Sequence, residues 1–143
     1  MGAFVADATI KELIKAGKAP KNCKVVIFGL TFKENCPDTR NSKVEDIIRR
    51  LEEFEIKPLI VDPWANERDA MKEYGVILTK LEDIKDVDCI ILAVAHNEFK
   101  NLSLDKIKLL FKKSQDNEKV LIDVKGLYSV KELKESKMKY WRL

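Results

Sequence analysis

The sequence has few cysteines and no long apolar run. Its three cysteines, Cys23, Cys36 and Cys89, are odd in number and form no C-x-x-C pair. Neither a disulfide framework nor a structural zinc site is therefore expected, and no other metal site is predicted. No apolar stretch approaches the roughly 20 residues of a membrane span. Because no signal-peptide pattern is present either, we expect a cytoplasmic protein with no membrane partner.

An excess of charge of one sign is also missing. The chain has 27 Lys and Arg against 24 Asp and Glu, and the two signs are interleaved along the sequence. This pattern leaves no basic footprint for nucleic acid. Glycine and proline are scarce, and 45% of the residues are hydrophobic, which excludes disordered and collagen-like chains. The length of 143 residues fits one ordinary domain with its own core.

Short apolar runs alternate with segments of helical periodicity. Runs such as KVVIFG at 24–29 and CIILAV at 89–94 are typical of strands buried on both faces of a parallel sheet. Ser/Thr-x-x-Glu patterns at 42–45, 79–82 and 129–132 predict helix starts. We therefore expect a Rossmann-like, doubly wound parallel α/β sheet of five to six strands. The remaining candidate strands are 59–61, 76–78, 120–122 and 139–143.

The loop after the first predicted strand is the strongest candidate site. A dinucleotide fold would carry G-x-G-x-x-G there, but the sequence reads GLTFKE from Gly29, so NAD binding at this turn is disfavoured. Instead the loop carries Phe32, Lys33 and Arg40 ahead of a helix, which together suit an anion such as phosphate. Asp38 could pair with Arg40. A solvated loop with a structural salt bridge explains the same residues equally well.

Four segments of the sequence resemble a known family: GLTFKENCPDTRNSKVEDII at 29–48, VDPWA at 61–65, YG at 74–75 and ILAVAHNEF at 91–99. The resemblance is to the C-terminal, UDP-binding domain of UDP-glucose/GDP-mannose dehydrogenases, and especially to the branch that oxidises UDP-N-acetylhexosamines. It implies that residues 1–19 are the end of a long helix linking two domains and that 20–143 form the UDP-sugar-binding domain.

The resemblance also implies an activity. Full-length members carry out two successive NAD-dependent oxidations that turn a sugar CH₂OH into a carboxylate. Their NAD is bound mainly by an N-terminal domain, and their catalytic cysteine lies in a GGHC-type motif. Neither the G-x-G-x-x-G pattern for NAD nor the GGHC motif occurs in these 143 residues. We therefore expect no catalytic residue in this chain, no turnover by it alone, and a homodimer or higher oligomer for the full-length protein.

Site residues follow from the resemblance position by position. Phe32 and Lys33 match the pair that lies against the UDP-sugar. Arg40 matches the arginine that reaches toward NAD and the reacting sugar, and Asp38 resembles the acid that orients it. Lys125 falls where many relatives carry an arginine that contacts substrate. Lysine there departs from the pattern, because a point charge does not replace a guanidinium fork.

Other interpretations remain open at this stage. The chain could be a stand-alone nucleotide-binding or assembly module without catalysis, or a flavodoxin-like binding domain. His96 ends a predicted strand and could bond to substrate, although capping of the next turn is favoured. Asp62 is interpreted as a turn former and Trp64 as a packing residue. The cysteines are interpreted as core or loop thiols rather than nucleophiles.

Overall fold

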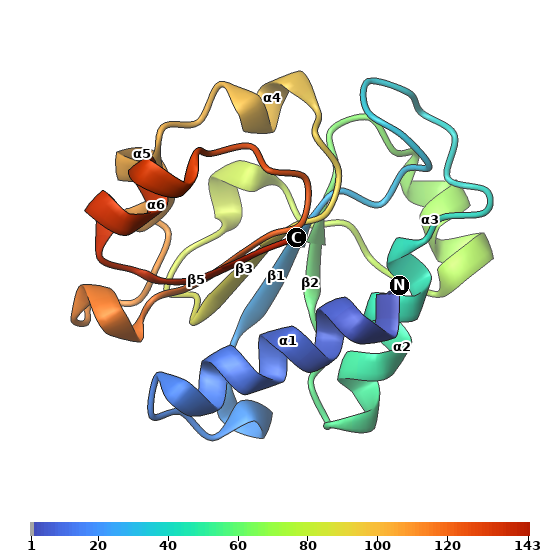
Figure 1. Cartoon of the computed structure of the whole chain (residues 1–143). Coiled ribbons are helices and arrows are strands. Elements are labelled where there is room, and N and C mark those ends of the chain that lie inside the picture. The colour runs from blue at the N-terminus through green and yellow to red at the C-terminus, as the bar shows by residue number, and fades with distance from the viewer. Residues whose placement is uncertain (1) are drawn as a thin grey trace.

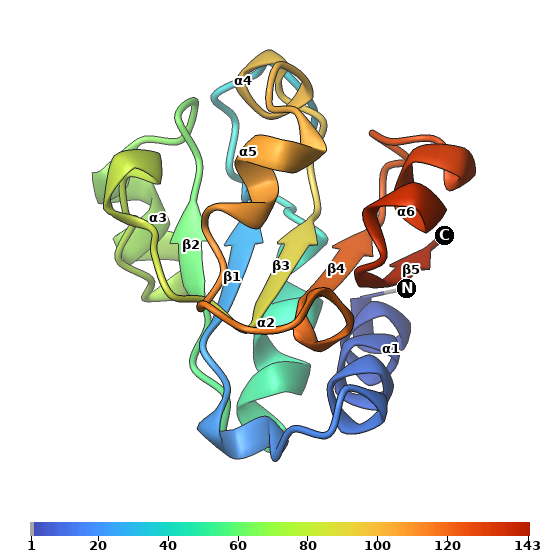
Figure 2. The same ribbon diagram turned by 90° about the vertical axis from the view of Figure 1, so that its left-hand side faces the viewer.

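The computed structural model describes residues 2–143 and contains one five-stranded sheet. All strands are parallel, in the order β2-β1-β3-β4-β5, which confirms the predicted fold class. Figure 2 shows the strands side by side with their arrowheads pointing the same way. Their bounds are Val25–Phe28 (β1), Leu59–Val61 (β2), Cys89–Leu92 (β3), Val120–Asp123 (β4) and Lys139–Arg142 (β5).

Helices cover both faces of the sheet. One apolar cluster joins alternate strand residues to α1 (Gly2–Lys15), α2 (Val44–Glu53) and α3 (Glu67–Tyr74). A second cluster joins the other strand residues to α4 (Asn97–Lys100), α5 (Leu104–Lys108) and α6 (Val130–Ser136). Within residues 2–143, no helix combines the length and the apolar character needed to cross a membrane. Short 3₁₀ turns lie at Pro20–Asn22, Leu81–Asp83 and Asp116–Glu118.

Helix α1 belongs to the same core as the rest of the chain. It lies along α2, as Figure 1 shows, and its Val5, Ala6 and Leu13 are buried. Phe4 meets Trp141 of β5 edge-on, with the ring centroids 5.8 Å apart. The first segment therefore closes the sheet face over β4 and β5.

Local sequence signals decide several helix ends, but not all of them. Ser129 and Glu132 form the predicted capping box of α6. The pattern at 42–45 forms no capping box, because α2 begins only at Val44 and the Ser42 hydroxyl accepts a bond from the Val44 N–H. The pattern at 79–82 yields only a 3₁₀ turn. The predicted strand at 76–78 is reduced to a single bridge between Ile60 and Leu78.

The end of β1 is shaped by Gly29. Its φ is +110°, and a Cβ at this position would lie 2.5 Å from the Cβ of Val94. Only glycine lets the backbone after β1 pass this close to the backbone after β3. Because β1 lies between β2 and β3, the chain reverses its direction of travel across the sheet here. The loop from Gly29 therefore starts at the switch point where ligands of such sheets bind.

Candidate functional site

A cleft of about 220 Å³ opens at this switch point, beyond the carboxyl ends of the strands. Lys33 reaches it from the loop after β1, Lys43 from the start of α2, and Lys125 from the loop after β4. Its lining therefore holds three lysines and one carboxylate, that of Glu34, and we call it the lysine cleft. The full lining is Thr31, Phe32, Lys33, Glu34, Lys43, Val44, Ala93, Val94, Ala95 and Lys125.

The structure brings three of the five predicted site residues together. Phe32, Lys33 and Lys125 all line the cleft, and the Phe32 ring is 51% exposed, so its face is open to a ligand. Lys43 was missed by the sequence reasoning. The capping pattern at Ser42 predicts a helix that starts earlier, so the side chain of Lys43 could not be placed at the cleft from sequence alone.

Lys125 owes its place to the acid that ends β4. The Asp123 carboxylate is fully buried and accepts bonds from the N–H groups of Leu127 (2.9 Å) and Tyr128 (3.0 Å). These bonds fold the loop between Asp123 and Tyr128 back onto the strand end. Lys125 stands at the tip of that turn, with its side chain exposed at the cleft.

Arg40 and Asp38 form the predicted ion pair but lie outside the cleft lining. Arg40 Nε is 3.1 Å and Nη2 is 3.3 Å from the two carboxylate oxygens of Asp38. These hydrogen bonds lower the pKa of Asp38 and raise that of Arg40. The Arg40 side chain is 78% exposed. Its guanidinium is therefore held by Asp38 and presented to the surroundings rather than to the lysines.

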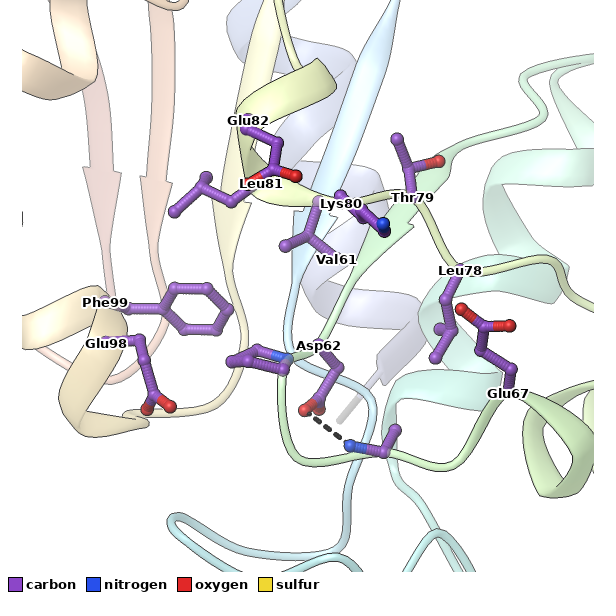
Figure 3. A pocket seen from close by; sticks show the side chains of 12 residues that line it. Val61, Asp62, Glu67, Leu78, Thr79, Lys80, Leu81, Glu82, Glu98 and Phe99 are labelled. Atoms are coloured by element: carbon purple, nitrogen blue, oxygen red, sulfur yellow. Dashed lines mark hydrogen bonds between the residues drawn. The ribbon is translucent and has the colours of Figure 1, made fainter.

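A second hollow, of about 360 Å³, lies beyond the carboxyl end of β2 (Figure 3). Its apolar side chains include Leu78 and Phe99. One lysine, Lys80, faces the carboxylates of Asp62, Glu67, Glu82 and Glu98 there. This balance of charge repels a diphosphate, whereas that of the lysine cleft attracts one. Electrostatics therefore favours the smaller cleft as the anion site.

Asp62 is the centre of a buried hydrogen-bond network between the lysine cleft and the hollow beyond β2. Its Oδ2 accepts bonds from the N–H groups of Leu30 (2.6 Å) and Thr31 (3.0 Å) and lies 3.0 Å from His96 Nε2. Its Oδ1 accepts from the N–H groups of Trp64 and Ala65, the second bond being the dashed line in Figure 3. Burial raises the pKa of Asp62, but the bonds from His96 and the backbone outweigh it, so the pKa lies below its ordinary value.

The structure confirms that His96 caps the next turn but assigns its side chain another role. The residue is the N-cap of α4, and its carbonyl accepts from the N–H groups of Phe99 and Lys100, but its side chain makes no capping bond. It is fully buried and bonds to Asp62 and to the loop after β1. The predicted turn-forming role of Asp62 is confirmed by its bonds to Trp64 and Ala65, yet its link to His96 was not foreseen.

The three cysteines lie apart from the lysine cleft. Cys89 is fully buried in β3, and burial raises the pKa of its thiol well above the ordinary value. Burial also raises the pKa of Cys23. Cys36 is half-buried in the loop after β1. In the part of the chain that the structure describes, no three His, Cys, Asp or Glu side chains are grouped to hold a metal ion.

Comparison with known protein families matches this chain to one family. Residues 26–130 match the UDP binding domain of UDP-glucose/GDP-mannose dehydrogenases, which is more than half of the chain. This chain belongs to that family. The matched segment includes the whole lysine cleft and the Asp62–His96 network.

Relatives with curated names include dehydrogenases of UDP-N-acetyl sugars. The chain is 45% identical over 127 residues to UDP-N-acetyl-D-glucosamine 6-dehydrogenase of Pseudomonas aeruginosa, covering 89% of this chain and 29% of that protein. It is 36% identical to protein CapL of Staphylococcus aureus, covering 100% of this chain and 32% of that protein. The chain therefore spans about a third of the length of these relatives, and its likeness to them concerns one domain.

Solved structures agree on the fold. NDP-N-acetyl-D-galactosaminuronic acid dehydrogenase from Methanosarcina mazei superposes with a TM-score of 0.85 at 22% identity, over 99% of this chain and 29% of that one. UDP-N-acetyl-mannosamine dehydrogenase Cap5O from Staphylococcus aureus gives 0.67 at 28% identity, over 99% of this chain and 30% of that one. The five-stranded sheet and its helices are thus the arrangement found in one domain of these enzymes.

Proposed function

We propose that this chain binds the diphosphate of a UDP-sugar in the lysine cleft. The observation that carries the proposal is the convergence of Lys33, Lys43 and Lys125 on one side of the sheet switch point. A diphosphate carries two or more negative charges, which three ammonium groups can neutralise with hydrogen bonds. The exposed Phe32 ring beside them offers an apolar face to the uridine or the sugar. The family description, a UDP binding domain, supports the same ligand.

The whole-protein activity that we propose is NAD-dependent oxidation of a UDP-N-acetylhexosamine to its uronic acid. The names of the relatives support this reaction class. In this reaction, the lysine cleft holds the UDP-sugar and fixes the sugar relative to groups supplied by another domain. Because the reactants are already oriented, less entropy must be lost before they react. We propose that Arg40, held by Asp38, reaches toward NAD and the sugar from the rim. NAD itself is proposed to bind mainly to a domain that this chain does not contain.

Residues 1–19 are proposed to be the end of a helix that links the two domains, and the full-length protein is proposed to be a homodimer or higher oligomer. Phe4 and Ile14 of α1 are each 59% exposed, although the opposite side of α1 packs on the core. Light scattering after size-exclusion chromatography measures the mass of the particle. A monomer for the full-length protein would contradict the oligomer proposal.

Calorimetric titration of the chain with UDP, UDP-N-acetylglucosamine and uridine tests the binding proposal. We expect binding of both diphosphates, weakened by added salt, and far weaker binding of uridine, which lacks the charges that the lysines neutralise. Lys33→Ala should weaken UDP binding roughly tenfold, the effect of one charge-assisted hydrogen bond. The control is Lys113→Ala, which removes an exposed lysine from the loop leading to the opposite end of β4.

Two results would count against the proposal. Equal affinity of the Lys33→Ala and Lys113→Ala variants for UDP would show that the lysine cleft does not bind it. Equal affinity of the chain for uridine and UDP would show that the diphosphate is not recognised. A separate assay addresses catalysis: the chain mixed with NAD and UDP-N-acetylglucosamine should form no NADH, and measurable NADH would contradict the proposed division of work between domains.

A further inference from the structure

The network around His96 reaches the loop that carries Phe32 and Lys33. His96 is 0% exposed, and its ring lies next to those of Trp64 (centroids 6.1 Å apart) and Phe99 (5.6 Å). Both ring nitrogens have partners in the protein. Nδ1 lies 2.9 Å from the backbone nitrogen of Asn35, and Nε2 lies 3.0 Å from Asp62 Oδ2 and 3.1 Å from Thr31 Oγ1. A ring so enclosed is closed to substrate.

These partners select one form of the ring. The Asn35 N–H can only donate, so Nδ1 must be the unprotonated acceptor. The Asp62 carboxylate can only accept, so Nε2 must carry the proton. The Thr31 hydroxyl donates its own proton to the carbonyl of Lys33 at 3.0 Å, which leaves its oxygen free to accept from Nε2–H. The network therefore requires a neutral imidazole with its proton on Nε2.

The ring thereby holds both ends of the segment from Thr31 to Asn35. At one end, Nε2 and Asp62 fix Thr31, whose hydroxyl bonds to the Lys33 carbonyl. At the other end, Nδ1 accepts from Asn35, which adopts a φ of +53°, a conformation that few non-glycine residues take. The Asn35 side-chain oxygen in turn accepts from the Asn97 N–H at 3.0 Å. We call the segment from Thr31 to Asn35 the arch. Phe32 and Lys33 lie on it, and hydrogen bonds hold both of its ends.

We propose that His96 is a positioning residue for UDP-sugar binding: through its Nδ1 acceptor it holds the arch on which Phe32 and Lys33 face the ligand. The inference rests on the proposed UDP site. Without the bond from Asn35, the arch gains freedom that the ligand must remove on binding, so affinity falls although no atom of His96 touches the ligand. The Nδ1–Asn35 bond, rather than burial of the ring, is the part of the network that acts on binding.

Two substitutions separate the bond from the packing. In His96→Asn, the amide oxygen can stand in for Nδ1 and accept from Asn35. In His96→Gln, the longer side chain can stand in for Nε2 and donate to Asp62, but it leaves the Asn35 N–H without its partner. We expect both variants to lose thermal stability. His96→Asn should bind UDP within about threefold of the wild type, whereas His96→Gln should bind roughly tenfold more weakly, the effect of one hydrogen bond.

Asp88→Asn is the control for general destabilisation. Asp88 is also a buried carboxylate, but it lies at the opposite end of the sheet, bound to Lys18 and to the backbone of Lys24. We expect this variant to lose stability and to keep its affinity for UDP. Equal weakening in all three variants would overturn the inference, because it would show a structural effect only. Equal affinity of His96→Gln and His96→Asn would overturn it as well.

A measurement on the unmodified chain guards against variants that fail to fold. His96 is the sole histidine of the sequence, so long-range ¹H–¹⁵N correlation reports its ring nitrogens without overlap. We expect the tautomer protonated at Nε2, and a ring protonated at Nδ1 would overturn the inference. If the wild type does not bind UDP, the proposed function fails together with this inference. If it binds and His96→Gln binds as tightly, only the role of His96 fails.

Discussion

Substitution of Asp62 by alanine should be among the most destabilising single changes in this chain. The carboxylate accepts bonds from the backbone N–H groups of Leu30, Thr31, Trp64 and Ala65, and it also meets His96 Nε2. Alanine removes every one of these acceptor contacts at once. It therefore releases three segments of the chain that are far apart in sequence.

The magnitude depends on which donors water can reach afterwards. The N–H groups of Leu30 and Thr31 are buried and lose their acceptor in a dry environment, whereas the buried His96 Nε2–H keeps the Thr31 hydroxyl as its acceptor. A buried donor left unpaired costs about 1–3 kcal/mol. The turn at Trp64 is part-buried and can be hydrated. Because water entering the vacated space recovers part of the loss, we expect a decrease of about 3–5 kcal/mol in the free energy of unfolding.

Urea denaturation followed by far-UV circular dichroism measures this decrease. The midpoint should fall with little change in the slope m, since the surface exposed on unfolding stays similar. Asp38→Ala is the control, because among residues 2–143 its carboxylate bonds only to the exposed Arg40, so its removal should shift the midpoint far less. A loss below about 1 kcal/mol for Asp62→Ala would refute the view that this carboxylate ties the three segments together.

Three further predictions concern stability. Gly29→Ala should cost about 2–4 kcal/mol in urea denaturation, because its φ is +110° and the new Cβ would strike Val94, whereas Gly75→Ala, with a φ of +67° and open space, should cost less. The pKa of Asp62 is lower in the folded than in the unfolded chain, so its ionised carboxylate contributes to the free energy of unfolding above pH 3.8, and this contribution is lost as pH falls toward the pKa of the folded chain. In Asp62→Asn, the free energy of unfolding should therefore fall less steeply as the solution is acidified. Ser129→Ala should cost about 1 kcal/mol in the same denaturation assay, and no measurable loss would contradict the capping role.

The sheet was predictable because its strands are read from local composition. Val25–Phe28 and Cys89–Leu92 are apolar throughout and are buried on both faces, which is the pattern of central parallel strands. The start of α2 was not predictable in this way. The Ser42 N–H donates to the hydroxyl of Tyr74, a residue from another helix, and this tertiary bond competes with the local capping pattern. Lys43 was missed for the same reason.

The candidate site was predictable in part. The rule that ligands bind beyond the carboxyl ends of strands pointed to the loop that carries Phe32 and Lys33, and the family resemblance pointed to Lys125. All three residues line one cleft in the structure. The pairing of Asp62 with His96 joins residues 34 positions apart, and no local pattern reports such a contact. His96 therefore looked like a cap from its position at a strand end. The distance between Arg40 and the lysines likewise depends on the course of an irregular loop, which composition does not determine.

The central claim is that UDP occupies the lysine cleft rather than the hollow beyond β2. A titration of the ¹⁵N-labelled chain with UDP, followed by two-dimensional NMR, tests it most directly. We expect saturable shifts centred on the amides of 31–34, 43–44, 93–95 and 125, which line the cleft. Shifts centred instead on the amides of 78–82 and 98–99, which line the acidic hollow, would contradict it.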